Sequence, residues 1–210
     1  MTQSQVREPR WPAFLAMVSA AGVFWALPEP LSVGPGWLLL AVIVLLMIPI
    51  VITNRRGYFQ VTRMLTFTAL GLITLSMIVS LIFLVHGIPE HREMPKSLLR
   101  SAIALWITNV LVFALWYWKL DAGGPLGRDH GRCRMRSSFL FPQLASQSPE
   151  HAAWSPQFLD YLYVAFNTST AFSPTDTAVL SRWAKVMGMA QSLISLSILA
   201  LLAARAINIL

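Results

Sequence analysis

The chain has 210 residues, of which 56% are hydrophobic and only 12% are charged, and its net charge at pH 7 is +7. A soluble domain carries about 25% charged residues, so this composition excludes an ordinary soluble protein and favours an integral membrane protein. The positive charge does not indicate nucleic acid as a partner, because the basic residues lie in short connections and no recognised nucleic-acid-binding module is present. The lone cysteine, Cys133, excludes an intrachain disulfide.

Five apolar stretches without Asp, Glu, Lys or Arg follow one another along the chain. Runs of about 18 such residues are long enough to cross the hydrocarbon core of a bilayer as a helix. Pro28 and Pro30 should end the first stretch, because proline cannot continue a helix, and Pro49 should kink the second. The sequence therefore predicts spanning helices over residues 11–27, 36–53, 64–85, 101–118 and 186–204.

The segment between the fourth and fifth stretches contains a short apolar run that cannot span. Residues 158–166 would form a helix about 14 Å long at 1.5 Å per residue, and a loop rich in Thr, Ser and Pro follows as far as Asp176. Half-helix, polar loop and full helix are the layout of a re-entrant loop. Irregular backbone at membrane depth is tolerated only where protein buries it or where it lines a water-filled cavity.

The sequence thus predicts an all-α membrane protein with five transmembrane helices plus one re-entrant, pore-like half-helix and loop. Its expected parts are a four-helix transmembrane bundle (1–119), a basic surface loop (120–155) and a re-entrant pore-loop and inner-helix module (156–210). The lipid bilayer is its predicted partner.

Residues 156–210 resemble the pore module of the potassium-channel superfamily, in which a pore helix, a filter and an inner helix follow one another. The aromatic run 158–166 matches the pore helix, and Asp176 lies near the acidic residue after the filter. The filter differs, because residues 170–174 read Thr-Ala-Phe-Ser-Pro where that family has Thr-Val-Gly-Tyr-Gly. The stacked carbonyls of that filter need backbone conformations that glycine adopts at little energetic cost. The resemblance therefore implies a homo-oligomeric pore, with a tetramer favoured, that is weakly selective or not potassium-selective among monovalent ions.

Most of the chain also resembles an uncharacterised bacterial integral membrane family. The shared features are Arg10-Trp11-Pro12, residues 112–117 at the end of the fourth stretch, residues 160–163 and 173–176, and Asn208. This resemblance implies a fold and a location in the bacterial inner membrane, but no activity.

The positive-inside rule predicts a cytoplasmic N-terminus, because that orientation places twelve Lys and Arg residues inside and four outside. The mouth of the re-entrant segment then faces the cytoplasm, whereas the pore loop of a potassium channel dips in from the outside. The sequence leaves open whether the module is inverted, the charge rule fails, or a span is miscounted.

Each candidate pore residue has a purely structural alternative. The hydroxyls before the loop could bind a dehydrated ion or could satisfy freed backbone groups, and Asp176 could attract cations or cap the following helix. The polar residues of the last span could line a pore or bond to a neighbouring helix. The pore- or filter-like candidates are Asn167, Thr168, Ser169, Thr170, Ala171, Phe172, Ser173 and Asp176, and the inner-helix candidates are Gln191, Ser192 and Ser195.

Three functions are compatible with these residues: a channel-like oligomer, a small-solute transporter or exporter, and a non-conducting structural subunit. Proton-coupled carriers usually place ionisable residues within their spans, which these spans lack. No His or Cys pair has metal-ligand spacing, and no nucleophile motif or catalytic triad is present. The sequence therefore predicts neither a metal, nor a cofactor, nor an enzymatic activity.

Overall fold

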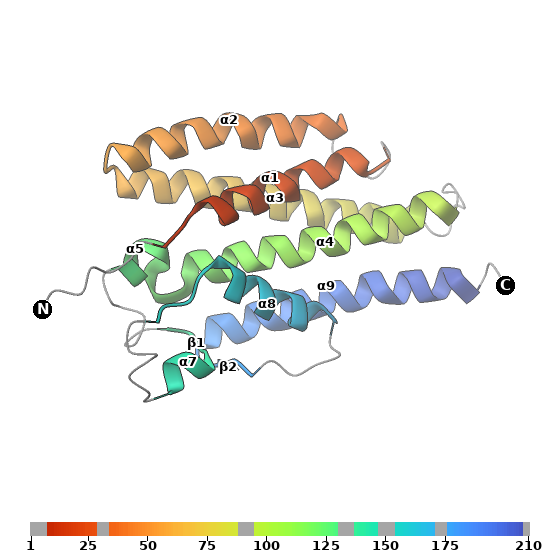
Figure 1. The fold of residues 1–210 in the computed structure, drawn as a ribbon. Coiled ribbons are helices and arrows are strands. Elements are labelled where there is room, and N and C mark those ends of the chain that lie inside the picture. Colours follow the sequence, from red (N-terminus) through yellow and green to blue (C-terminus); the bar gives the residue numbers. More distant parts are fainter. Residues whose placement is uncertain are drawn as a thin grey trace, which may run out of the picture.

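The computed structural model describes residues 8–28, 34–87, 95–129, 137–146, 154–170 and 176–207, and nearly all of these are helical. Four helices are long and apolar enough to cross a membrane, which supports the prediction of a multi-pass membrane protein. They lie side by side in one elongated bundle (Figure 1). These helices are α2 (Gly36–Arg55), α3 (Phe59–Gly87), α4 (Pro95–Leu120) and α9 (Arg182–Ile207).

The first of the five predicted spans is shorter than expected. Helix α1 (Trp11–Val23) has 13 residues and continues for three more as the 3₁₀-helix η1 (Phe24–Ala26). At 1.5 Å per residue α1 is about 20 Å long, against about 30 Å for a hydrocarbon core. Its buried residues are mostly alanine, which lets α1 approach α2 and α4 closely. Four long helices and one shorter one therefore replace the predicted set of five full spans.

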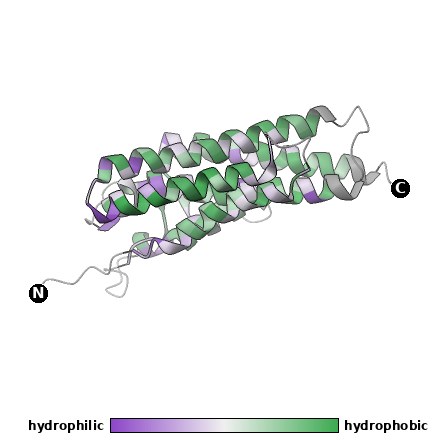
Figure 2. Ribbon diagram, turned by 90° about the horizontal axis from the view of Figure 1, so that it is seen from above, coloured by the Kyte–Doolittle hydropathy of each residue, from purple (hydrophilic) through white to green (hydrophobic). Residues whose placement is uncertain are grey.

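Helix α4 is the centre of the bundle. It contacts α1, α3 and α9, and its side chains from Val112 to Leu115 are all buried. Helices α2 and α9 lie at the edges and expose rows of large apolar side chains. Figure 2 shows hydrophobic residues along the length of the helices and hydrophilic ones gathered toward the end where α2 meets α3. Lipid contact along the helices and water at their ends account for this distribution.

At that end the chain makes a sharp turn after α4. The turn consists of η3 (Asp121–Gly123) and α5 (Gly124–Asp129), and it places Ala122, Gly123 and Gly124 at φ values of 52°, 82° and 78°. A Cβ added to Gly124 would lie 2.8 Å from the carbonyl oxygen of Lys119. Glycine is therefore required at position 124 both for its backbone conformation and for space.

Part of the predicted surface loop pairs with the segment just before the last helix. Strand β1 (Phe139–Leu140) pairs antiparallel with β2 (Ala178–Val179), and the short helix α7 (Pro142–Ala145) follows β1. This pairing ties the loop before the half-helix to the segment just before α9.

The predicted half-helix is present as α8 (Phe158–Thr170), which packs on both α4 and α9. Figure 1 shows α8 and α9 starting at the same end of the molecule and running in the same direction. Near the start of α8 the backbone N–H of Gln157 donates to Oδ2 of Asp160 at 2.7 Å, as in half of a capping box. Strand β2 lies near the start of α9, so the described chain is there back at the end where α8 begins.

Candidate functional site

A network of polar side chains joins α4, α8 and α9, with Gln191 at its centre. Gln191 is fully buried, and its amide Nε2 donates to the carbonyl oxygen of Ala165 at 2.7 Å and to Oγ of Ser169 at 2.8 Å. Its amide oxygen accepts a hydrogen bond from the hydroxyl of Tyr117 at 2.7 Å. The amide of Gln191 therefore bonds to two neighbouring helices of its own chain.

The other two inner-helix candidates also bond to neighbouring helices. Nδ2 of Asn109 donates to Oγ of Ser195 at 2.9 Å and to the backbone carbonyl of Gln191 at 3.2 Å. The hydroxyl of Ser192 donates to the carbonyl oxygen of Thr168 at 3.3 Å. Asn109 was not among the predicted site residues. Its position within a predicted span could have indicated this contact, because polar side chains in spans usually hydrogen-bond to a neighbouring helix.

The hydroxyls at the end of α8 are also engaged within the chain. Oγ1 of Thr168 donates to the carbonyl oxygen of Val164 at 2.8 Å, and Oγ1 of Thr170 donates to that of Asn167 at 3.2 Å. Ser169 accepts from Gln191, as described above. All three hydroxyls are therefore bonded within the chain. Thr170 bonds to a carbonyl of the last four residues of α8, which the helix end leaves free, whereas Thr168 bonds to a carbonyl inside the helix.

Two polar atoms next to this network are buried without a partner among the described residues. They are Oδ1 of Asn109 and Nδ2 of Asn167. A buried donor or acceptor left unsatisfied costs about 1–3 kcal/mol. A water molecule that accepted from Nδ2 of Asn167 or donated to Oδ1 of Asn109 would remove that cost.

The filter-like residues Ala171, Phe172 and Ser173 lie outside the described residues, and Asp176 is exposed. Asp176 does not cap the last helix, so this alternative is wrong: residues 178–179 form β2, and α9 begins only at Arg182. The hydroxyl of Ser181 caps α9 instead, accepting the backbone N–H of Ala184 at 3.4 Å. Pairing with β1 outweighs the local capping signal at Asp176.

A second polar cluster lies where α4 turns into α5, around the buried guanidinium of Arg128. Its Nη2 and Nε donate to Oε2 of Glu8 at 2.9 and 3.1 Å, and its Nη1 donates to the carbonyl oxygens of Trp118 and Asp121 at 2.8 and 3.1 Å. The indole N–H of Trp118 donates to the other oxygen of Glu8. Burial raises the pKa of Glu8, and the opposing effects of Arg128 and Trp118 only partly offset it.

The carboxylate of Asp121 continues this cluster toward α8. It is fully buried and accepts hydrogen bonds from the hydroxyls of Tyr161 and Ser137 at 2.7 and 2.8 Å and from the backbone N–H of Ser138. The guanidinium of Arg128 lies 5.0 Å from the centre of the Tyr161 ring. The cluster thus joins the start of the described chain, the end of α4, the β1 segment and α8.

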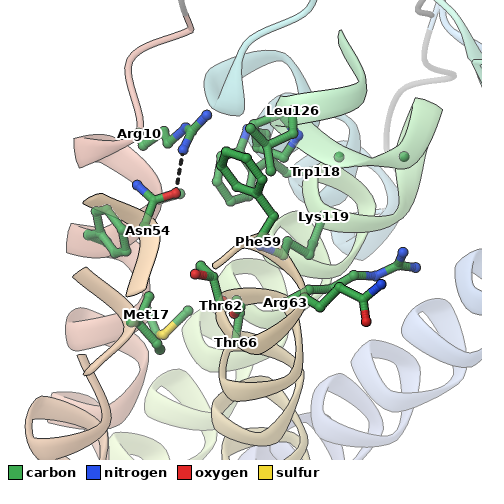
Figure 3. Close-up of a pocket in the computed structure, with 17 residues that line it drawn as sticks. Arg10, Met17, Asn54, Phe59, Thr62, Arg63, Thr66, Trp118, Lys119 and Leu126 are labelled. Atoms are coloured by element: carbon green, nitrogen blue, oxygen red, sulfur yellow. Dashed lines mark hydrogen bonds between the residues drawn. The ribbon is translucent and has the colours of Figure 1, made fainter. Parts of the chain in front are cut away.

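A cavity of about 220 Å³ opens at the same end, between α1, α2, α3 and the α4–α5 turn. Figure 3 shows Arg10 and Asn54 on one side and Phe59, Trp118 and Lys119 on the other. Arg10 donates to Oδ1 of Asn54 at 2.8 Å. The walls combine basic groups with apolar side chains, a combination suited to an anionic ligand that has an apolar part.

Comparison with protein-family models, with curated proteins and with solved structures finds no match for this chain. Among the described residues, no group of three or more His, Cys, Asp or Glu side chains is placed to hold a metal ion.

Proposed function

We propose that this chain is a subunit of a channel-like, oligomeric membrane protein of weak or non-potassium selectivity, with α8, α9 and their connection as its conducting element. The observation that carries the proposal is that α8 begins at the same end as α9 and stops partway along the bundle. A chain that enters a bilayer without crossing it must return through irregular backbone, which requires surrounding protein or water. The resemblance of residues 156–210 to a potassium-channel pore module supports the same proposal.

The position of the module leaves it accessible to further copies of the chain. Helix α9 exposes Val186, Met189, Leu193 and Leu196 along one face, each between 60 and 64%. These side chains recur every three or four residues, so they form one continuous apolar stripe. In the proposed oligomer this stripe faces the other subunits, and residues 167–176, rather than the buried side chains of Gln191 and Ser195, contact the ion.

The charge distribution supports an inverted orientation of the module. Helix α8 starts at the end of the bundle that also carries Arg55 and Arg56 at the end of α2, and Lys119 in the last turn of α4. The positive-inside rule assigns such an end to the cytoplasm. In the proposed protein the N-terminus is cytoplasmic, and α8 enters the membrane from the cytoplasmic side, opposite to a potassium-channel pore helix.

The proposal predicts an oligomer that conducts monovalent cations without a strong preference for potassium. We expect crosslinking of the purified protein in lipid nanodiscs to give an assembly larger than a monomer, and reversal potentials in mixed potassium and sodium to shift only slightly, because the filter segment lacks glycine. Protein-free bilayers are the control. A strictly monomeric protein would contradict the proposal, and saturable solute uptake without ionic current would favour a carrier instead.

Asp176 should act through its charge if the module conducts cations. Asp176→Asn keeps the shape of the side chain and removes its charge, so we expect lower cation conductance at low ionic strength and a smaller difference at high salt. Asp160→Asn provides a matched control, because the carboxylate of Asp160 is held by the backbone N–H of Gln157 at the start of α8. Equal single-channel conductance of Asp176→Asn and the unmodified protein at low salt would remove Asp176 from the conducting site.

A further inference from the structure

We propose that the cavity between α1, α2, α3 and the α4–α5 turn binds the phosphate group of an anionic amphiphile. In this arrangement the phosphate lies among the basic side chains of Arg10, Arg63 and Lys119, and the apolar part lies against Phe14 and Met17. No residue of α8 or α9 lines the cavity, so the inference stands independently of the proposed conducting role.

The first support is an excess of positive charge at the cavity. Arg10, Arg63 and Lys119 line it, and neither Asp nor Glu does. Arg10 pairs with Asp129 outside the lining, at 3.3 Å. Neither Arg63 nor Lys119 forms an ion pair with any residue that the structure describes. Within the described part of the chain, these two cations face aromatic rings rather than carboxylates, since the guanidinium of Arg63 lies 5.4 Å from the centre of the Phe67 ring.

The second support is that the ammonium of Lys119 is repelled by the guanidinium groups around it. Lys119 is within electrostatic range of Arg10, Arg63 and Arg128. Its ammonium lies 6.0 Å from the Trp118 ring, which offers less stabilisation than a carboxylate would. Like charges gathered in a partly buried site raise the energy of the protein, and a bound anion would reverse that cost.

The third support is the depth and composition of the cavity. It lies at the ends of the helices, where Trp118 and Lys119 form the aromatic and basic border typical of the headgroup region. Deeper in the bundle its wall consists of Ala13, Met17 and Ile50, which are buried. Basic pockets between membrane helices on the cytoplasmic side are a known way of holding lipid phosphates. An amphiphilic phosphate ester matches both parts of the wall.

The test uses the full chain, purified in a neutral detergent and titrated with phosphatidylglycerol, with phosphatidylcholine and with inorganic phosphate. We expect phosphatidylglycerol to bind, and Arg63→Gln/Lys119→Met to bind it about 25-fold more weakly, since each basic residue contributes roughly fivefold near a lipid phosphate. Arg55→Gln/Arg56→Gln removes the same charge from the α2–α3 turn outside the cavity and should bind normally. Lys119→Arg keeps the charge and should also bind.

The arms distinguish the two sources of phosphate. Tight binding of phosphatidylglycerol with weak binding of inorganic phosphate identifies a lipid, whereas tight binding of inorganic phosphate alone identifies a soluble phosphate compound, and both results support a phosphate site. Equal binding of phosphatidylcholine and phosphatidylglycerol, or equal binding by the two double variants, overturns it. Should the Lys119→Met change prevent folding, Arg63→Gln, which alters an exposed residue, decides the same question.

Discussion

Replacing Arg128 by methionine should destabilise the protein by about 3–5 kcal/mol, because it leaves the Glu8 carboxylate buried without its cation. The pair is almost completely enclosed, with side-chain exposures of 1% for Arg128 and 6% for Glu8. The change also removes the hydrogen bonds from Arg128 to the carbonyl oxygens of Trp118 and Asp121. Those oxygens end α4 and begin the turn into α5, so we expect the turn to loosen as well.

The expected loss is measured as the change in free energy of unfolding of the purified protein at pH 7. The double variant Glu8→Gln/Arg128→Met should recover much of it, because a neutral amide is cheaper to bury than an unpaired carboxylate. Arg182→Met is the matched control, since Arg182 is exposed at the start of α9 and surface changes usually stay within about 0.5 kcal/mol. Equal stability of Arg128→Met and Arg182→Met would contradict the importance of the buried pair.

The pH dependence of this loss has a definite sign. The pKa of Glu8 is raised by burial above its ordinary value of 4.5, so its contribution to stability is full below 4.5 and is lost as pH rises through the folded-state pKa. Removing Arg128 also removes an influence that lowers this pKa, so the pKa should rise further. The deficit of Arg128→Met should therefore shrink on acidification, when Glu8 becomes protonated, and Glu8→Gln/Arg128→Met should lack this dependence.

The long helices were predictable because hydropathy and length are local properties of a sequence. Residues 36–53 and 186–204 were expected as spans, and α2 and α9 contain them. The length of α1 was not predictable in the same way. Its apolar run of 17 residues reads as a span, but the run includes a turn of 3₁₀-helix that contacts α2. It then ends in extended backbone at Leu27, the conformation that Pro28 favours in the residue before it.

The contacts that organise the polar sites are long-range and left no local pattern. Arg128 and Glu8 are 120 positions apart, and each alone resembles an ordinary charged residue near a helix end. The pairing of β1 with β2 is also long-range, and two-residue strands carry no periodicity that would predict it. Because this pairing was not predicted, Asp176 was considered as a cap of the last helix. The polar side chains of α9 were found from their spacing, but only the structure shows them bonded to α4 and α8.

Replacing Gln191 by leucine should cost about 2 kcal/mol of stability, because it leaves the Tyr117 hydroxyl, Ser169 and the Ala165 carbonyl without their common partner. A single hydrogen bond between membrane helices averages about 0.6 kcal/mol, and an orphaned buried polar group costs more. The loss is measured by unfolding in lipid or detergent. Ser197→Ala on the exposed side of the same helix is the control, since the hydroxyl of Ser197 donates within α9, to the carbonyl of Leu193.

A double-mutant cycle with Tyr117→Phe separates packing from pore lining. If Gln191 binds α4 as described, Gln191→Leu should cost less in the Tyr117→Phe background, where no tyrosine hydroxyl is left to orphan. A residue that lined a water-filled pore would behave differently, because its change to leucine would lower conductance while leaving stability and the cycle unaffected. Additive effects of the two changes, combined with lost conductance, would move Gln191 from the interhelical network to the pore. Coupling between them, combined with retained conductance, would leave ion contact to the α8–α9 connection.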